Sequence, residues 1–169
     1  MKKSFLLFVF AFGALYTNAQ RYAIVDTRYI LTKLPAYTQA QQRLDSFSVQ
    51  WQHEIDVMAA DVQRMTNLFD AEQVMLSDEL KRKRQIEINN KETELRGLQK
   101  RRFGFEGDIF KKRQELIKPI QDRVYAAIQK VAATKMYDFI LDKSEGITVI
   151  FADPKLDHSD DVLRELGVK

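Results

Sequence analysis

The feature that most constrains this chain is a stripe of apolar residues at helical spacing between residues 44 and 69. From its second member the stripe steps by four, three, four, three and four residues, and its first member lies one heptad earlier. Its members are Leu44, Trp51, Ile55, Met58, Val62, Met65 and Phe69. Polar and charged residues fill the gaps, so the pattern predicts a long amphipathic helix with one face available for packing. We call this stripe the seam.

The seam helix has a recognisable beginning and end. Pro35 is tolerated in a first helical turn, so we expect a helix over residues 36–75, which would reach roughly 60 Å at about 1.5 Å per residue. Ser77 followed by Asp78 and Glu79 is typical of an N-cap and an acidic first turn. We therefore place a hairpin tip near residues 76–78. A tip at Gly104 would instead leave a return path too short for the outgoing arm.

The returning arm carries fewer apolar residues than the seam helix. Between residues 77 and 102 they are Leu80, Ile86, Ile88, Leu95 and Leu98. Two glycines then interrupt the helical pattern at residues 103–107. A third helical segment follows, which Pro119 should kink because proline removes a backbone donor and clashes with the preceding turn.

Strand-like segments occur at both ends of the chain. Residues 22–25, 137–141 and 148–151 have β character, with a turn-rich connector at 142–146, and Ser159 and Gly167 should bound a short last helix. We expect a body made of residues 20–34 and 134–169 with three short strands, and a helical tentacle over residues 35–133. A body this small buries little surface, which favours self-association. The residues expected in that body are Ile24, Val25, Ile140, Val149 and Phe151.

The first residues predict export. Lys2 and Lys3 precede an apolar run at residues 5–15 that is too short to span a bilayer, and small residues lead up to Ala19. We expect a signal peptide over residues 1–19, cleaved after Ala19; the alternative is an uncleaved anchor. The chain has no cysteine, which excludes disulfides, thiol chemistry and a lipid-modified cysteine.

The two predicted arms differ in charge. Residues 35–76 hold two basic and six acidic residues, net −4, whereas residues 77–118 hold thirteen basic and eight acidic, net +5. One basic cluster, just past the expected tip, is Lys81, Arg82, Lys83 and Arg84. Either the arms simply attract and solubilise one another, or this cluster contacts an anionic surface such as lipid headgroups or lipopolysaccharide.

No pattern in the sequence indicates an enzyme. A phosphate-binding glycine loop, a nucleophile elbow and a zinc-protease motif are all missing. His53 and His158 lie far apart in sequence, and His53 is expected on a helix surface. We expect no catalytic, metal-binding or cofactor-binding residues. The whole chain carries +3, and +1 without Lys2 and Lys3, which implies no nucleic-acid partner.

The seam allows two interpretations. It could only zip the two arms together, or part of it could stay accessible because the returning arm offers too few apolar residues to cover it. Methionine is flexible and suits contact with varied apolar partners. The candidates for such contact are Trp51, Met58, Val62, Met65 and Phe69.

Several motifs resemble those of the Skp, or OmpH-like, family of periplasmic chaperones. They are residues 22–26, 29–31, 35–37, 103–107, 110–121 and 159–163, and the stretch at 114–121 is the most specific. The resemblance implies a jellyfish-shaped homotrimer, mainly α with a small β body, whose helical tentacles hold unfolded outer-membrane proteins without ATP. The break at 103–107 departs from the plainest form of that fold, in which the returning arm is continuous.

The expected function is therefore an ATP-independent holdase in the periplasm that prevents aggregation of unfolded outer-membrane proteins. Two alternatives remain: a structural coiled-coil protein of the envelope, and a binder of lipopolysaccharide or membrane surfaces without unfolded clients.

Overall fold

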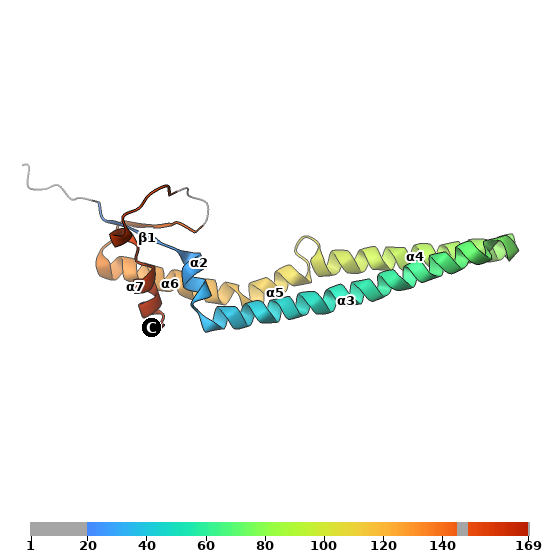
Figure 1. Cartoon of the computed structure of the whole chain (residues 1–169), viewed down its shortest axis with the longest axis horizontal. Coiled ribbons are helices and arrows are strands. Elements are labelled where there is room, and N and C mark those ends of the chain that lie inside the picture. Colours follow the sequence, from blue (N-terminus) through green and yellow to red (C-terminus); the bar gives the residue numbers. More distant parts are fainter. Residues whose placement is uncertain (1–19, 145–148, 169) are drawn as a thin grey trace, which may run out of the picture. The chain divides into compact units, whose positions relative to one another are not determined.

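The structure, a computed structural model, describes residues 20–144 and 149–168 (Figure 1). The expected signal peptide lies outside these residues. The chain divides into two compact units, one spanning residues 31–123 and the other made of the segments before residue 31 and after residue 123. We call them the arm unit and the body unit.

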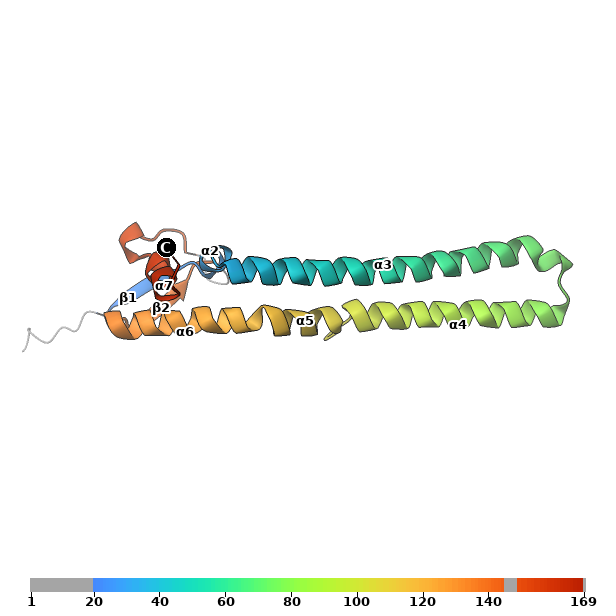
Figure 2. The same cartoon turned by 90° about the horizontal axis from the view of Figure 1, so that it is seen from below.

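The arm unit is a helical hairpin, as predicted (Figure 2). Its outgoing helix α3 (Pro35–Glu72) lies beside α4 (Asp78–Phe103) and α5 (Asp108–Leu116). A 3-10 turn, η1 (Gln73–Met75), precedes the reversal, and Ser77 caps α4 by accepting a hydrogen bond from the Leu80 amide at 3.4 Å. None of the described helices combines the length and the hydropathy needed to cross a bilayer.

The break in the returning arm depends on two glycines. Gly104 ends α4, and its amide donates to the Lys100 carbonyl at 2.9 Å. A Cβ on Gly104 would lie 2.3 Å from that carbonyl oxygen, and one on Gly107 would lie 2.8 Å from the Arg101 carbonyl oxygen. Both glycines have negative φ, so it is space and not backbone angle that requires them. Glu106 between them adopts a φ of 52°.

A second interruption lies just before Pro119. Helix α5 ends at Leu116, Ile117 is not helical, and α6 (Lys118–Lys135) begins at the next residue. Pro119 thus occupies the first turn of a new helix, where its missing backbone donor costs little. The predicted kink is a boundary between two helices.

The body unit contains a two-stranded parallel sheet. Strand β1 (Tyr22–Val25) leads into α2 (Thr27–Thr32) and pairs with β2 (Phe139–Asp142), with Tyr22 opposite Phe139 and Val25 opposite Asp142. After the undescribed residues come the 3-10 turn η2 (Pro154–Leu156) and helix α7 (Ser159–Glu165). The buried side chains of this unit are Ala23, Ile24, Val25, Ile30, Val124, Ala127, Val131, Val162 and Leu163.

The prediction of a third strand at residues 148–151 is wrong for residues 149–151, which are not in a strand; Thr148 lies outside the described residues. The reason is visible in the hydrogen bonds of β1. The carbonyls of Arg21 and Val25 accept from the β2 side, and the Ile24 carbonyl, on the other edge, accepts from the His158 amide at 2.8 Å. The free edge of β1 is therefore occupied by the segment that enters α7.

The predicted cap of the last helix is also wrong. His158 occupies the N-cap position, and Ser159 is the buried first residue of α7. The Ser159 hydroxyl accepts from the Asp26 amide at 2.8 Å and donates to Asp157 at 2.6 Å, so it ties α7 to the end of β1. The predicted stop at Gly167 is confirmed: its φ is 79°, a value that favours glycine.

Replacing Gly107 with alanine should destabilise the arm unit by about 1–3 kcal/mol, because the added methyl group would press on backbone atoms of residues that cannot move independently. Chemical denaturation followed by circular dichroism measures this loss.

Gly97→Ala is the matched control. Gly97 lies inside α4, and the nearest atom to its added Cβ would be an Arg101 side-chain nitrogen at 4.0 Å. This variant should stabilise the chain by about 0.5–1 kcal/mol, since alanine loses less entropy in a helix. Equal effects of the two substitutions would contradict our account of the break.

Candidate functional site

The seam is buried unevenly along α3. Leu44, Ile55 and Val62 are buried, whereas the other members are only half-buried: Trp51, Met58, Met65 and Phe69. Across the hairpin, α4 buries Ile88 and Leu98. Two buried residues on a helix of 26 residues cannot cover a stripe of this length. Part of the seam therefore stays accessible to solvent.

The accessible part opens into a cavity near the tip, which we call the distal groove. Its volume is about 180 Å³. Apolar side chains from both arms line it together with three charged ones: Met65, Leu68, Phe69, Leu76 and Ile88, with Arg64, Glu72 and Arg84. Met65 and Phe69, two of the predicted contact residues, thus lie in one cavity. Met58 and Val62 do not line it.

The groove exists because the first turns of α4 are almost entirely polar. Leu80 and Ile86 are 49% and 58% exposed, so Ile88 is the first residue of α4 to be buried. Sequence reasoning missed Leu68 and Leu76 as members of this surface, because Leu68 falls outside the heptad positions and Leu76 lies in the reversal. Their positions become meaningful only when the two arms are placed side by side.

Trp51, also a predicted contact residue, is engaged within the hairpin. Its ring stacks on Phe47 with centroids 5.5 Å apart, and the Arg102 guanidinium lies 5.0 Å from its centroid. Arg102 also donates to Glu54 on α3 at 2.9 and 3.1 Å and to Asp108 on α5 at 2.7 Å. Arg102 therefore joins three helices where the returning arm is broken. Nothing in the sequence distinguishes it from Lys100 and Arg101 beside it.

The predicted basic cluster lies in the first turns of α4. Lys81 pairs with Asp78 at 3.8 Å and Arg84 with Glu87 at 3.5 Å, both partners being on the same helix. Arg82 and Lys83 are exposed and have no ion pair within the described part of the chain. These cations do not bridge to α3 in the described structure, where Arg102 joins the arms instead.

The five residues predicted for self-association have different environments. Ile24 and Val25 are buried in the core of their own unit, and Ile140 on β2 is half-buried. Val149 is half-buried and Phe151 is 84% exposed, both outside any strand. Only some of the five are therefore available to a partner chain.

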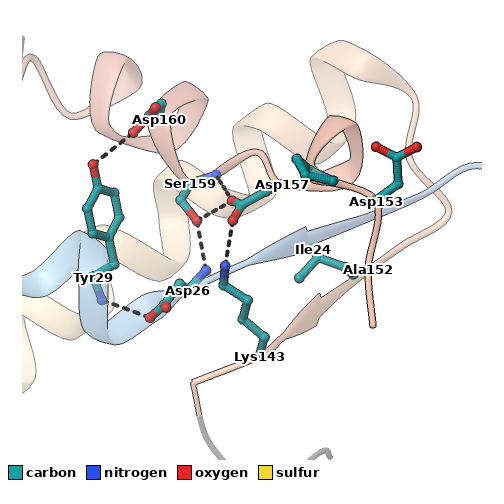
Figure 3. A pocket seen from close by; sticks show the side chains of 10 residues that line it. Ile24, Asp26, Tyr29, Lys143, Ala152, Asp153, Asp157, Ser159 and Asp160 are labelled. Carbon is teal, nitrogen blue, oxygen red and sulfur yellow. Dashed lines mark hydrogen bonds and ion pairs between the residues drawn. The ribbon is translucent and has the colours of Figure 1, made fainter. Parts of the chain in front are cut away.

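A pocket in the body unit, with a volume of about 490 Å³, lies between β1 and the start of α7 (Figure 3). Its acidic side chains already accept hydrogen bonds from other groups of the same unit. Asp157 accepts from Lys143 at 2.7 Å, and Asp160 accepts from the Tyr29 hydroxyl at 3.2 Å. Within the described ranges no group of His, Asp and Glu side chains is arranged to hold a metal ion.

Three groups of the body unit have shifted pKa values, so the stability of this unit should depend on pH. Burial, followed by the charge of Lys135, lowers the pKa of His158, whose ring nitrogens lie 2.6 Å from the Tyr137 hydroxyl and 2.6 Å from Asp161. Burial works against ionisation of Asp157, but hydrogen bonds from Lys143 and Ser159 outweigh it and lower its pKa. The pKa of Asp142 is likewise lowered, because bonds from Thr27 and Ser144 outweigh burial.

Acidification should therefore destabilise the body unit in two steps. A group with a lowered folded-state pKa binds protons more readily when unfolded, so its contribution disappears as pH falls. The His158 step should begin near pH ~6.5 and the carboxylate step near pH ~4. Calorimetric melting temperatures between pH 8 and 3 measure both. His158→Gln should remove the first step and keep the second; an unchanged first step would contradict this assignment.

Comparison with known proteins agrees with this architecture. The family model "Outer membrane protein (OmpH-like)" matches residues 21–166. No curated protein sequence matches the chain. A crystal structure from Caulobacter crescentus CB15, described as a proposed outer membrane chaperone (OmpH-like), shares the fold with a TM-score of 0.67 at 14% identity over 90% of each chain. Because the family model spans nearly the whole described chain, this protein belongs to the OmpH-like outer membrane protein family.

Proposed function

We propose that this protein is an ATP-independent holdase of the periplasm that binds unfolded outer-membrane proteins and prevents their aggregation. The observation that carries the proposal is the distal groove, where the hairpin leaves apolar side chains accessible beside three charged ones. Membership of the OmpH-like family and the fold shared with a proposed outer membrane chaperone support it. Export by a signal peptide at residues 1–19 is part of the proposal.

The chemistry of the groove suits a client without fixed structure. An unfolded β-barrel strand presents alternating apolar side chains in variable conformations. Met65 and the half-buried Met58 have flexible, polarizable side chains that adapt to such partners. Charged side chains line the groove together with the apolar ones, so each apolar contact is weak and the client can be released without ATP. Several arms around one client would raise the effective concentration of every later contact.

A homotrimer would supply those several arms. The body unit exposes large apolar side chains, and exposed apolar surface of this kind is typical of a protein–protein interface. Tyr22 and Phe139 stack with centroids 5.7 Å apart and are each 44% exposed, and Ile150 and Phe151 are 95% and 84% exposed. These exposed residues favour assembly through the body unit.

The trimer is tested by native mass measurement of residues 20–169. We expect three copies at micromolar concentration, and Phe151→Asp should shift the protein to monomers because a charge is costly in an apolar interface. Lys155→Gln, at an exposed position of η2, changes the net charge by the same amount and is the control, which should leave the mass unchanged. A stable monomer for the parent chain would contradict the assembly.

Client holding is tested by substitution at Met58, Met65 and Phe69. Replacing all three with glutamine should weaken suppression of aggregation of a denatured β-barrel protein on dilution by roughly a hundredfold or more, since about 1–2 kcal/mol of apolar contact is lost at each of the three sites. Light scattering measures aggregation, and circular dichroism and native mass check that helix content and assembly persist.

Val49→Gln with Val57→Gln is the matched control, because both valines lie exposed on α3 outside the seam and outside the groove. This control should hold client like the parent. If the triple variant instead loses its helices, the seam is hairpin core and the client surface lies elsewhere. If it stays folded and holds client normally, the client surface likewise lies elsewhere. If the parent chain itself does not hold client, a structural role in the envelope replaces the holdase.

The basic cluster at residues 81–84 supports a second candidate function, contact with anionic lipid or lipopolysaccharide. The observation that favours it is the exposure of Arg82 and Lys83 without ion pairs in the described structure. Four Gln substitutions at Lys81, Arg82, Lys83 and Arg84 should lower such binding in a salt-dependent way.

A further inference from the structure

The distal groove has the size of one side chain. Its volume is about 180 Å³. A closed cavity of about 150 Å³ with aliphatic and aromatic walls holds one benzene molecule, so the groove has room for one aromatic side chain but not for a stretch of strand. A client polypeptide therefore enters the groove through a single residue at a time.

The apolar walls of the groove favour an aromatic occupant over an aliphatic one. Met65 and Phe69 line the groove from α3, and both are half-buried. A thioether beside a ring, and two rings in an offset or edge-to-face arrangement, gain more than the burial of their area alone. A leucine in the same place would gain only the burial of its surface.

Two guanidinium groups border these walls. Arg64 comes from α3 and Arg84 from α4. Arg64 pairs with Asp61 on its own helix at 2.9 Å. Arg84 pairs with Glu87 on its own helix at 3.5 Å. A planar guanidinium can keep such a bond while its face covers an aromatic ring, so these pairs leave both arginines able to contact an occupant.

The hairpin already contains this arrangement elsewhere. Arg102 lies 5.0 Å from the centroid of the Trp51 ring while it donates to Glu54 at 2.9 Å. The face of an aromatic ring is electron-rich and attracts a cation, whereas an aliphatic side chain has no such face. The positive border of the groove is therefore complementary in charge to an aromatic ring.

Glu72 adds a hydrogen-bond acceptor to the same border. It is exposed, and its carboxylate has no ion pair or hydrogen bond within residues 20–144 and 149–168. A tyrosine hydroxyl or a tryptophan ring N–H can donate to a carboxylate, whereas phenylalanine has no side-chain donor. The groove thus offers apolar walls and guanidiniums to the ring and an acceptor to its polar group.

We propose that the distal groove binds tyrosine and tryptophan side chains of an unfolded client, and so gives the protein a preference for polypeptides rich in these residues. The inference rests on the proposed holdase function, because it names the part of the client that the groove contacts. Outer-membrane barrels carry girdles of aromatic residues at both membrane interfaces, where tyrosine and tryptophan are enriched. An unfolded barrel therefore presents suitable side chains repeatedly along its chain.

Methyl NMR of residues 20–169 with isotope-labelled methionine tests this occupant. The probes are short blocked peptides of glycine and serine around one central tyrosine, cyclohexylalanine or leucine. Cyclohexylalanine is close to phenylalanine in shape and at least as apolar, but it has no π face. The tyrosine peptide should shift the Met65 methyl signal by its ring current and bind roughly threefold more tightly than the cyclohexylalanine peptide. Met136, which lies in the body unit, should not shift.

Glu72→Ala tests the hydrogen bond separately from the ring. It should lower the affinity for the tyrosine peptide by roughly threefold, to that of a matching phenylalanine peptide, and leave the phenylalanine peptide unaffected. Asp70→Ala is the matched control, because it removes the same charge at an exposed position of α3 outside the groove. This control should preserve the affinities for both peptides.

Two results would overturn the preference. The cyclohexylalanine peptide would bind as tightly as the tyrosine peptide if the groove accepts any apolar side chain. The Met65 signal would stay unshifted with every peptide if the groove takes no aromatic side chain. Neither result bears on the holdase, which light scattering of the parent chain with a denatured β-barrel protein decides. If the parent chain does not hold that protein while the tyrosine peptide still shifts Met65, the holdase and the assignment of barrel clients fail together.

Discussion

The arm unit depends on the burial of one side of α3 against a returning arm that has too few apolar residues to cover it. Ile55 and Val62 on α3 are buried, and the buried residues of α4 are Ile88 and Leu98. Burial of each large aliphatic side chain contributes roughly 1.5–3 kcal/mol to stability. Because the buried residues are widely spaced, they hold the two arms together at a few points and not along their whole length. The same imbalance leaves the distal groove open. Stability of the arm and accessibility of its apolar surface therefore come from one arrangement of residues.

Where apolar packing is sparse, Arg102 makes the connection between the helices. It contacts the Trp51 ring, Glu54 and Asp108 at the break in the returning arm. An exposed ion pair contributes little by itself, but a planar guanidinium that stacks and donates to two carboxylates loses less entropy per bond formed. The break can therefore be accommodated without separating α4 from α5.

Local signals predicted the elements well where they act over a few residues. The heptad spacing indicated the outgoing helix, and Ser77 indicated the start of the returning helix. The two glycines and Pro119 indicated the two interruptions of the returning arm. These signals work because caps, glycine and proline act on the neighbouring backbone. The third strand failed for the opposite reason. Residues 149–151 have suitable side chains, but the edge of β1 accepts the His158 amide, which lies further along the chain. Strand pairing is a competition between distant segments, and propensity does not decide it.

The sequence by itself determined that the chain forms a long helical hairpin, since apolar periodicity and helix-end signals are local properties. Only the tertiary structure decided which seam residues stay accessible, because exposure depends on what the other arm places opposite each one. Met65 and Phe69 line a cavity, whereas Trp51, which belongs to the same heptad pattern and is also half-buried, packs against Phe47 and Arg102. A residue 51 positions away in the chain sets the environment of Trp51, and no pattern within the helix records it.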